Sequence, residues 1–234
     1  MLRRTTWIVL LAGAVPLIAV HLAYATNLAW GDIVVCYPPV NGCTSISASV
    51  RAGPGIYVYR ILAVPAAVLF VFSWVLLADW LRLIRVDKPL TIRLLRLFGI
   101  LGALFFIVYA NFLGEDVSFA GLGKRIGVAG YFLFTALAQL LLVIIIWPHR
   151  QRIIREHTGH PVSWLLGLVT LEWTIGVGFA VVRRSYEFSE QTLFQLTNLA
   201  EWNYAFAMVG TYIAIAWMFQ SSRFESHTRL GESA

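Results

Sequence analysis

Charged residues are scarce in this sequence. Asp, Glu, Lys and Arg make up 13% of the 234 residues, whereas 59% are hydrophobic. Soluble domains carry about one quarter charged residues. A chain of this length with so few charges cannot cover its surface against water. The composition therefore excludes a soluble globular protein and indicates that lipid covers the surface instead.

Motifs for nucleotide or catalytic-metal binding are also missing. The chain has no glycine pattern of the Rossmann or P-loop type and no HExxH motif. Its net charge of +6 comes from basic residues in short clusters between apolar runs. Topology signals are distributed in this way, and a nucleic-acid groove is not. We therefore expect no nucleic-acid partner, no cofactor and no metal ion.

Long apolar runs dominate what is present. A helix needs about 20 apolar residues to cross the hydrocarbon of a bilayer. Unpaired backbone groups are costly there, and no alternating pattern of barrel strands is visible. The sequence therefore predicts an all-α, polytopic integral membrane protein with six transmembrane helices. The predicted spans are residues 6–25, 56–81, 95–113, 127–147, 164–182 and 195–219.

The distribution of Lys and Arg predicts the orientation. With a cytoplasmic N-terminus, twelve of the 18 Lys and Arg residues fall on the inner side and six on the outer side. The outer six are Arg51, Arg60, Lys124, Arg125, Arg183 and Arg184. This bias follows the positive-inside rule and places both termini in the cytoplasm. Residues 1–220 would form the transmembrane domain, and residues 221–234 a flexible cytoplasmic tail.

The first apolar run has a second interpretation. Two arginines precede it, and it ends in Ala23-Tyr24-Ala25, which resembles a secretory signal with a small-residue cleavage site. The run is longer than the apolar region of most signals, and His21 lies within it. We therefore expect an uncleaved helix, with cleavage to a five-span protein as the alternative.

The first outer loop contains both cysteines, Cys36 and Cys43. An outer loop meets oxidising conditions, and the Pro-Pro and Asn-Gly pairs between the cysteines favour a turn. We predict a disulfide bond, with free thiols as the alternative. The bond would staple the base of a hydroxyl-rich segment that includes Ser45 and Ser47, giving a structured first outer loop.

Ionisable side chains inside apolar spans are costly, so each needs a partner or a purpose. Arg60 lies about one turn inside the outer end of the second predicted span, and Glu201 about two turns inside that of the sixth. Asn198 shares a helical face with Glu201. Opposite charges at similar depth in a low dielectric are expected to meet or to share a ligand. A purely structural ion pair is the alternative.

Charged loop residues extend this candidate site. An acidic pair follows the third span and an arginine pair ends the fifth. A lining of both signs suits a phosphorylated, amine-bearing lipid headgroup. The predicted ligand-binding residues are Arg60, Glu115, Asp116, Arg183, Asn198 and Glu201.

The loop serines provide a catalytic alternative. A nucleophilic serine needs a base and an orienting group within reach. His21 is the only histidine on the predicted outer side, so Ser45 or Ser47 with His21 and Glu201 forms the candidate catalytic set. The other interpretation is that the hydroxyls satisfy backbone groups of an irregular loop.

The order of these motifs resembles a known superfamily. The matching elements are Ser45-Ile46-Ser47, Pro54, Tyr57-Val58-Tyr59-Arg60, Glu115-Asp116, Arg183 or Arg184, and Glu201-Trp202. On them the sequence is similar to the six-span Frag/DRAM/Sfk superfamily. That superfamily includes the damage-regulated autophagy modulators, proteins that remodel the lipid of GPI anchors, and the N-terminal part of the Cwh protein. Thr44 stands where the family has a proline. The resemblance implies an integral membrane protein tied to lipid handling.

Together these features predict a multi-pass membrane protein that handles lipid and binds a lipid headgroup in an outer-face pocket. One alternative is a membrane acyltransferase or hydrolase that uses a loop serine. Another is a structural or regulatory subunit that packs against a membrane-protein partner.

Overall fold

The apolar runs of the sequence form long helices. The computed structural model describes residues 3–115, 120–155 and 161–224, and within these ranges it contains no strand. The long helices are α1 (Arg4–Ala29), α4 (Gly55–Leu83), α5 (Pro89–Phe112), α6 (Ala120–Ile146), α8 (Pro161–Ser185) and α9 (Glu190–Ser221). The short ones are α2 (Pro38–Asn41), α3 (Ile46–Arg51), η1 (Trp147–His149) and α7 (Arg150–Ile153). The predicted all-α fold is confirmed for the described residues.

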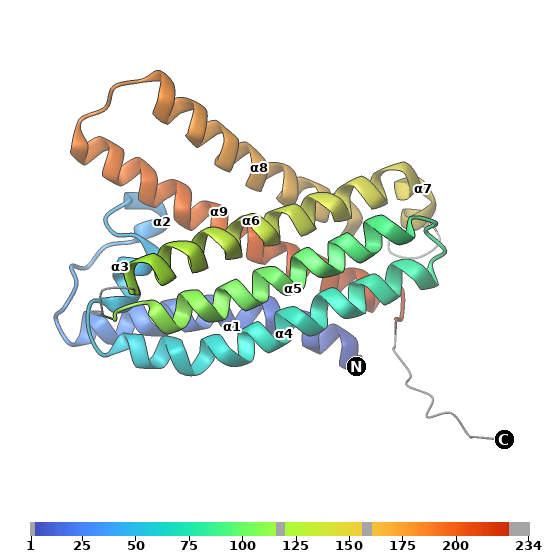
Figure 1. The fold of residues 1–234 in the computed structure, drawn as a ribbon, viewed down its shortest axis with the longest axis horizontal. Coiled ribbons are helices and arrows are strands. Elements are labelled where there is room, and N and C mark those ends of the chain that lie inside the picture. Colours follow the sequence, from blue (N-terminus) through green and yellow to red (C-terminus); the bar gives the residue numbers. More distant parts are fainter. Residues whose placement is uncertain (1–2, 116–119, 156–160, 225–234) are drawn as a thin grey trace.

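The long helices run back and forth, so the two ends of the described chain lie together (Figure 1). The Thr5 hydroxyl donates to the Phe224 carbonyl at 2.6 Å, and Phe224 packs on the ring of Phe219. The chain is therefore held through the first residues of the predicted tail 221–234, and residues 225–234 lie outside the described ranges. Residues 30–54, which join α1 to α4, lie at the opposite end of the bundle, here called the disulfide end.

Five described segments are long and apolar enough to cross a membrane, as expected of a multi-pass membrane protein. They are Arg4–Ala29, Gly55–Leu83, Pro89–Phe112, Ala120–Ile153 and Pro161–Ser185. The sixth predicted span, 195–219, lies in α9, which is 32 residues long and is not among the five. The first half of α9 is rich in Gln, Thr, Asn and Glu, and this lowers its hydropathy. Those polar side chains contribute to the candidate site.

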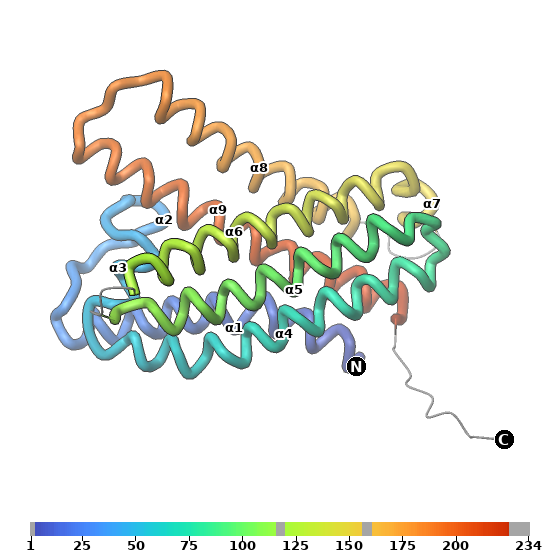
Figure 2. Tube along the Cα trace, viewed as in Figure 1, coloured from blue at the N-terminus to red at the C-terminus, as the bar shows by residue number. Residues whose placement is uncertain are grey.

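The neighbours of each helix define the shape of the bundle. α1 packs against both α4 and α9, α5 packs between α4 and α6, and α8 packs mainly against α9. All the buried residues of α8 lie in its first half, from Pro161 to Glu172. Toward the disulfide end, α8 diverges from α6 in the trace (Figure 2). The second half of α8 therefore leaves a gap beside α6 and α9.

Small residues allow the helices to approach closely, as is common where lipid rather than water surrounds a bundle. The most extensive contact joins α5 and α6. At Gly127 of α6, an added Cβ would lie 2.5 Å from the backbone nitrogen of Tyr109 in α5. Aromatic rings fill the centre, where Trp74 Nε1 donates to the Tyr212 hydroxyl at 3.0 Å and Phe70 packs on Tyr212.

Replacing Gly127 with alanine tests this close approach. We expect Gly127→Ala to destabilise the bundle by on the order of 1–3 kcal/mol, because the methyl group meets backbone that cannot rotate away. Gly167→Ala in α8 is the matched control, since no atom lies within 4 Å of its added Cβ. The measurement is the melting temperature in mild detergent. Equal melting temperatures for the two variants would contradict the close α5–α6 approach.

Candidate functional site

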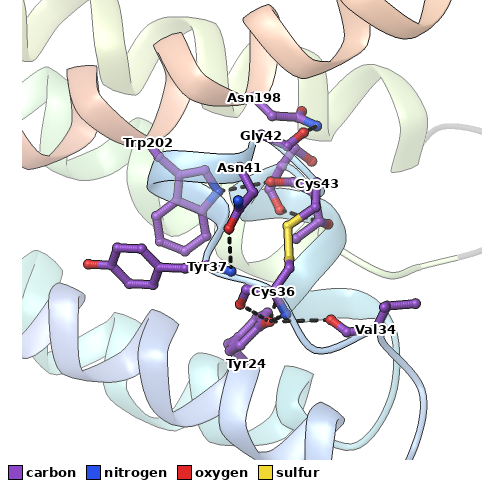
Figure 3. The surroundings of a disulfide bond; sticks show 11 residues. Tyr24, Val34, Cys36, Tyr37, Asn41, Gly42, Cys43, Asn198 and Trp202 are labelled. Carbon is purple, nitrogen blue, oxygen red and sulfur yellow. Dashed lines mark hydrogen bonds between the residues drawn. A yellow bond between two sulfur atoms is a disulfide. The ribbon is translucent and has the colours of Figure 1, made fainter.

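A disulfide bond shapes the loop at the disulfide end (Figure 3). Cys36 and Cys43 are joined, with 6.7 Å between their Cα atoms, as predicted. Between them lies α2, which begins with Pro38 and ends at Gly42 in the left-handed conformation, φ 62°. Proline starts a helix well, and glycine accepts a positive φ without strain. The turn residues between the cysteines therefore form a compact helical turn that the bond closes.

Side chains of α9 hold this loop by its backbone carbonyls. Asn198 Nδ2 donates to Gly42 O at 2.8 Å, and Trp202 Nε1 donates to Thr44 O at 2.9 Å. Asn198 and Trp202 are four residues apart and share one face of the helix. Figure 3 shows both side chains reaching the loop from the α9 side. Asn198, a predicted ligand-binding residue, thus secures the loop.

The end of α1 holds the loop from the other side. The Tyr24 hydroxyl donates to Cys36 O at 2.7 Å. Asn27 is fully buried, and its Nδ2 donates to Ser49 O at 2.8 Å and Val50 O at 3.0 Å. Its Oδ1 accepts from the Gly55 amide at 2.7 Å. The sequence analysis did not single out Asn27, although an amide near the end of an apolar helix is a signal for such a role.

The Glu201 carboxylate lies at the start of α3. It lies within reach of the backbone amides of Ile46 and Ser47. Ser45 is the N-cap of α3, and its Oγ accepts from the Ala48 amide at 3.0 Å. The first amides of a helix have no partner within the helix, and they favour a negative charge. Glu201 therefore ties the middle of α9 to the hydroxyl-rich loop.

Beneath α3 lies a space that we call the central cavity. Its volume is about 50 Å³, and it lies between α1, α3, α4, α5, α6 and α9. Most of its lining is apolar or aromatic. The polar side chains that line it are His21, Tyr59, Tyr109, Tyr131 and Glu201.

A second space, the side cleft, lies where α8 diverges from α6. Its volume is about 210 Å³, and it is lined by Ile175, Gly176 and Phe179 of α8 together with residues of α6 and α9. Glu201 and Phe132 line both the side cleft and the central cavity. The Glu201 carboxylate is thus the charged group that borders both of these largely apolar spaces.

Arg60 has other partners. Its guanidinium donates to the carbonyls of Asn111 at 3.1 Å and Leu113 at 2.7 Å, and it forms an ion pair with Glu115. The last carbonyls of a helix lack partners within the helix, so Arg60 caps the C-terminal end of α5. Arg60 is not among the residues that line the central cavity. The structure therefore brings Arg60 together with Glu115, and it gives Glu201 a separate set of contacts.

Two predicted ligand-binding residues remain, Arg183 and Asp116. Arg183 is exposed near the end of α8. Asp116 lies outside the described residues. Within the described ranges, no group of three or more His, Cys, Asp or Glu side chains gathers that could hold a metal ion.

The candidate catalytic residues are engaged separately. Ser47 Oγ shares a hydrogen bond with the Tyr109 hydroxyl at 2.9 Å, and Ser45 Oγ caps α3. His21 Nδ1 contacts the carbonyl of Leu17 at 2.8 Å, and its ring packs edge-on to that of Trp202. His21 and Glu201 do line the same cavity. No serine–histidine hydrogen bond is present among the described residues, so neither hydroxyl has a base in place.

Comparison of the chain with protein-family models, curated proteins and solved structures found no match. The function is therefore argued from the site itself.

The anchoring role of Asn27 can be tested directly. In Asn27→Leu, two carbonyls lose their donor and the Gly55 amide loses its acceptor, at a cost of on the order of 1–3 kcal/mol for each buried group left unpaired. We expect at least tenfold faster hydrogen exchange over residues 44–56, measured by mass spectrometry. Asn111→Leu is the control, because the Asn111 side chain donates within its own helix, to Ile107 O. Unchanged exchange in Asn27→Leu would contradict the role.

Proposed function

We propose that this protein is an integral membrane lipid-handling protein, with a lipid headgroup bound at the disulfide end. The observation that carries the proposal is the position of Glu201, which borders both the central cavity and the side cleft. An amphiphile has the matching chemistry. Its polar group would lie beside the carboxylate, and its hydrocarbon would fill the apolar space next to it.

The lining indicates which polar groups fit. Glu201 is an acceptor for amine or hydroxyl groups, and the exposed His21 ring stands at the α1–α9 side of the same cavity. Aromatic rings cover most of the remaining wall, including Tyr109, Phe132 and Trp202. Concave, mostly apolar sites with a few convergent polar groups are typical of small-ligand binding. A headgroup with hydroxyl or amine groups suits this lining.

The side cleft offers a lateral entrance. The second half of α8 has no buried residue, and Ile175 and Phe179 of α8 line the cleft. In a bilayer this side of the bundle would face acyl chains. A lipid would therefore enter from the membrane and would not need to cross the aqueous loops.

Three observations support a six-span topology with both termini in the cytoplasm. The ends of the described chain lie together, opposite the disulfide loop. The disulfide itself suits an oxidising, non-cytoplasmic side. The Lys and Arg bias points the same way. In this topology α9 crosses the membrane, and in its polar half Asn198 is buried while Thr197 and Glu201 are partly buried.

The contact between the loop and α9 also supports the resemblance to the Frag/DRAM/Sfk superfamily. Two elements on which that resemblance depends, Ser45-Ile46-Ser47 and Glu201-Trp202, lie far apart in the sequence. They meet where Glu201 lies within reach of the amides of Ile46 and Ser47. A lipid-handling role fits such a site. The catalytic alternative has less support, since both serine hydroxyls are occupied by other partners.

Single introduced cysteines test the topology. Both native cysteines are joined in the disulfide, so Glu187→Cys or Ser221→Cys adds one reactive thiol. We expect a membrane-impermeant maleimide to label Glu187→Cys in intact cells, and Ser221→Cys only after permeabilisation. Labelling of both from the same side would show that α9 does not cross the membrane.

Lipid retention tests the function. We expect Glu201→Gln to lose most of the lipid that copurifies with the wild-type protein in mild detergent, because the neutral amide attracts a headgroup amine or hydroxyl less than a carboxylate does. Native mass spectrometry of the intact protein measures the bound lipid, and Glu187→Gln at an exposed loop position is the control.

A second variant separates binding from folding. Ala205→Phe fills the central cavity, which Ala205 lines, and leaves Glu201 in place. We expect it to lose bound lipid with little change in melting temperature. Full retention of lipid in both variants would refute the proposal.

A further inference from the structure

The charged residues at the rim of the disulfide end form a second site, which we call the rim cleft. Its volume is about 430 Å³, and it lies between the end of α3, the end of α5 and the start of α6. Its charged side chains are Arg51, Glu115 and Lys124. The central cavity and the side cleft are mostly apolar, whereas this cleft is mostly polar.

Among the described residues, the positive charges of Arg51 and Lys124 in the cleft have no ion-pair partner. Glu115 is already paired with Arg60. Arg51 and Lys124, from different helices, lie within electrostatic reach of each other. Neither forms an ion pair with any acidic side chain in the described part of the chain. Bringing like charges together costs free energy, and a bound anion would offset that cost.

The start of α6 adds donors that suit an anion. Ala120 and Gly121 line the cleft in the first turn of this 27-residue helix. The amides of a first turn have no partner within the helix and favour negative charge. No atom lies within 4 Å of the Cβ position of Gly121, so a ligand can approach the backbone there.

These residues are also the ones that the topology does not explain. Arg51 and Lys124 fall on the predicted outer side, where the positive-inside rule predicts few cations. A cation on the outer side that does not set the topology is available to bind an anion.

We infer that the rim cleft binds the phosphoryl group of a lipid headgroup, held by Arg51 and Lys124. The inference rests on the proposed lipid-handling function for the source of the phosphate, and it adds a phosphate subsite to it. α3 connects the two sites, since its first amides contact Glu201 and its last residue is Arg51. Ser47, between them, bonds to the Tyr109 hydroxyl that lines the central cavity.

The test measures binding of dihexanoyl phosphatidic acid to the full-length protein in phosphatidylcholine nanodiscs. We expect saturable binding to the wild type and at least about tenfold weaker binding to Arg51→Gln and to Lys124→Gln, the loss expected from one charge-assisted contact. Arg125→Gln is the matched control. It removes the same charge from an exposed neighbour that does not line the cleft, and its affinity should stay within about twofold.

Further comparisons identify the source of the phosphate and separate the two proposals. Glycerol 3-phosphate binding as tightly as the lipid would assign the cleft to a soluble phosphate and overturn the lipid part of the inference. Equal weakening in Arg125→Gln and Lys124→Gln, or no saturable binding to the wild type, would overturn the site itself. Loss of copurified lipid in Glu201→Gln with no phosphatidic acid binding would refute the rim cleft alone. Melting temperatures confirm that each variant is folded.

Discussion

The contact between the Glu201 carboxylate and the first amides of α3 supports the rest of the disulfide end. Backbone groups that leave water must find partners, and a loop inserted among helices has many of them. α9 supplies partners through Asn198, Trp202 and Glu201, and α1 supplies them through Tyr24 and Asn27. The central cavity exists because these side chains hold the loop over the bundle and keep it from packing down into it.

Arg60 also supplies partners to backbone groups that lack them, in this case at the end of a helix. The end of α5 leaves carbonyls without helical partners, and the guanidinium donates to three of them and pairs with Glu115 as well. An arginine near the end of a span is costly in lipid, and here helix carbonyls and a carboxylate offset that cost. The start of α4 is thereby fixed to the end of α5 next to the rim cleft, where Arg51 and Lys124 form no ion pair with any described acidic side chain.

Hydropathy predicted most of the fold because every long helix needs an apolar run, and the disulfide followed from two cysteines around a turn. The partners of the charged residues could not be predicted in the same way. Arg60 and Glu201 have similar depths in the predicted spans, but α1 packs against both α4 and α9, and the two side chains have different neighbours. Depth follows from position in the sequence, whereas the direction of a side chain depends on which helices are adjacent. Arg51 and Lys124 are far apart in the sequence, so their proximity could be seen only in the folded structure.

The double use of Glu201 would have a consequence for exchange of the proposed lipid ligand. An amine or hydroxyl group of the ligand that bonds to this carboxylate would compete with the amides of Ile46 and Ser47 for the same oxygen atoms. Occupancy of the cavity and attachment of α3 are then thermodynamically linked, so each weakens the other by an equal free energy. Binding in the central cavity would therefore loosen the attachment of α3, and release of the ligand would restore it.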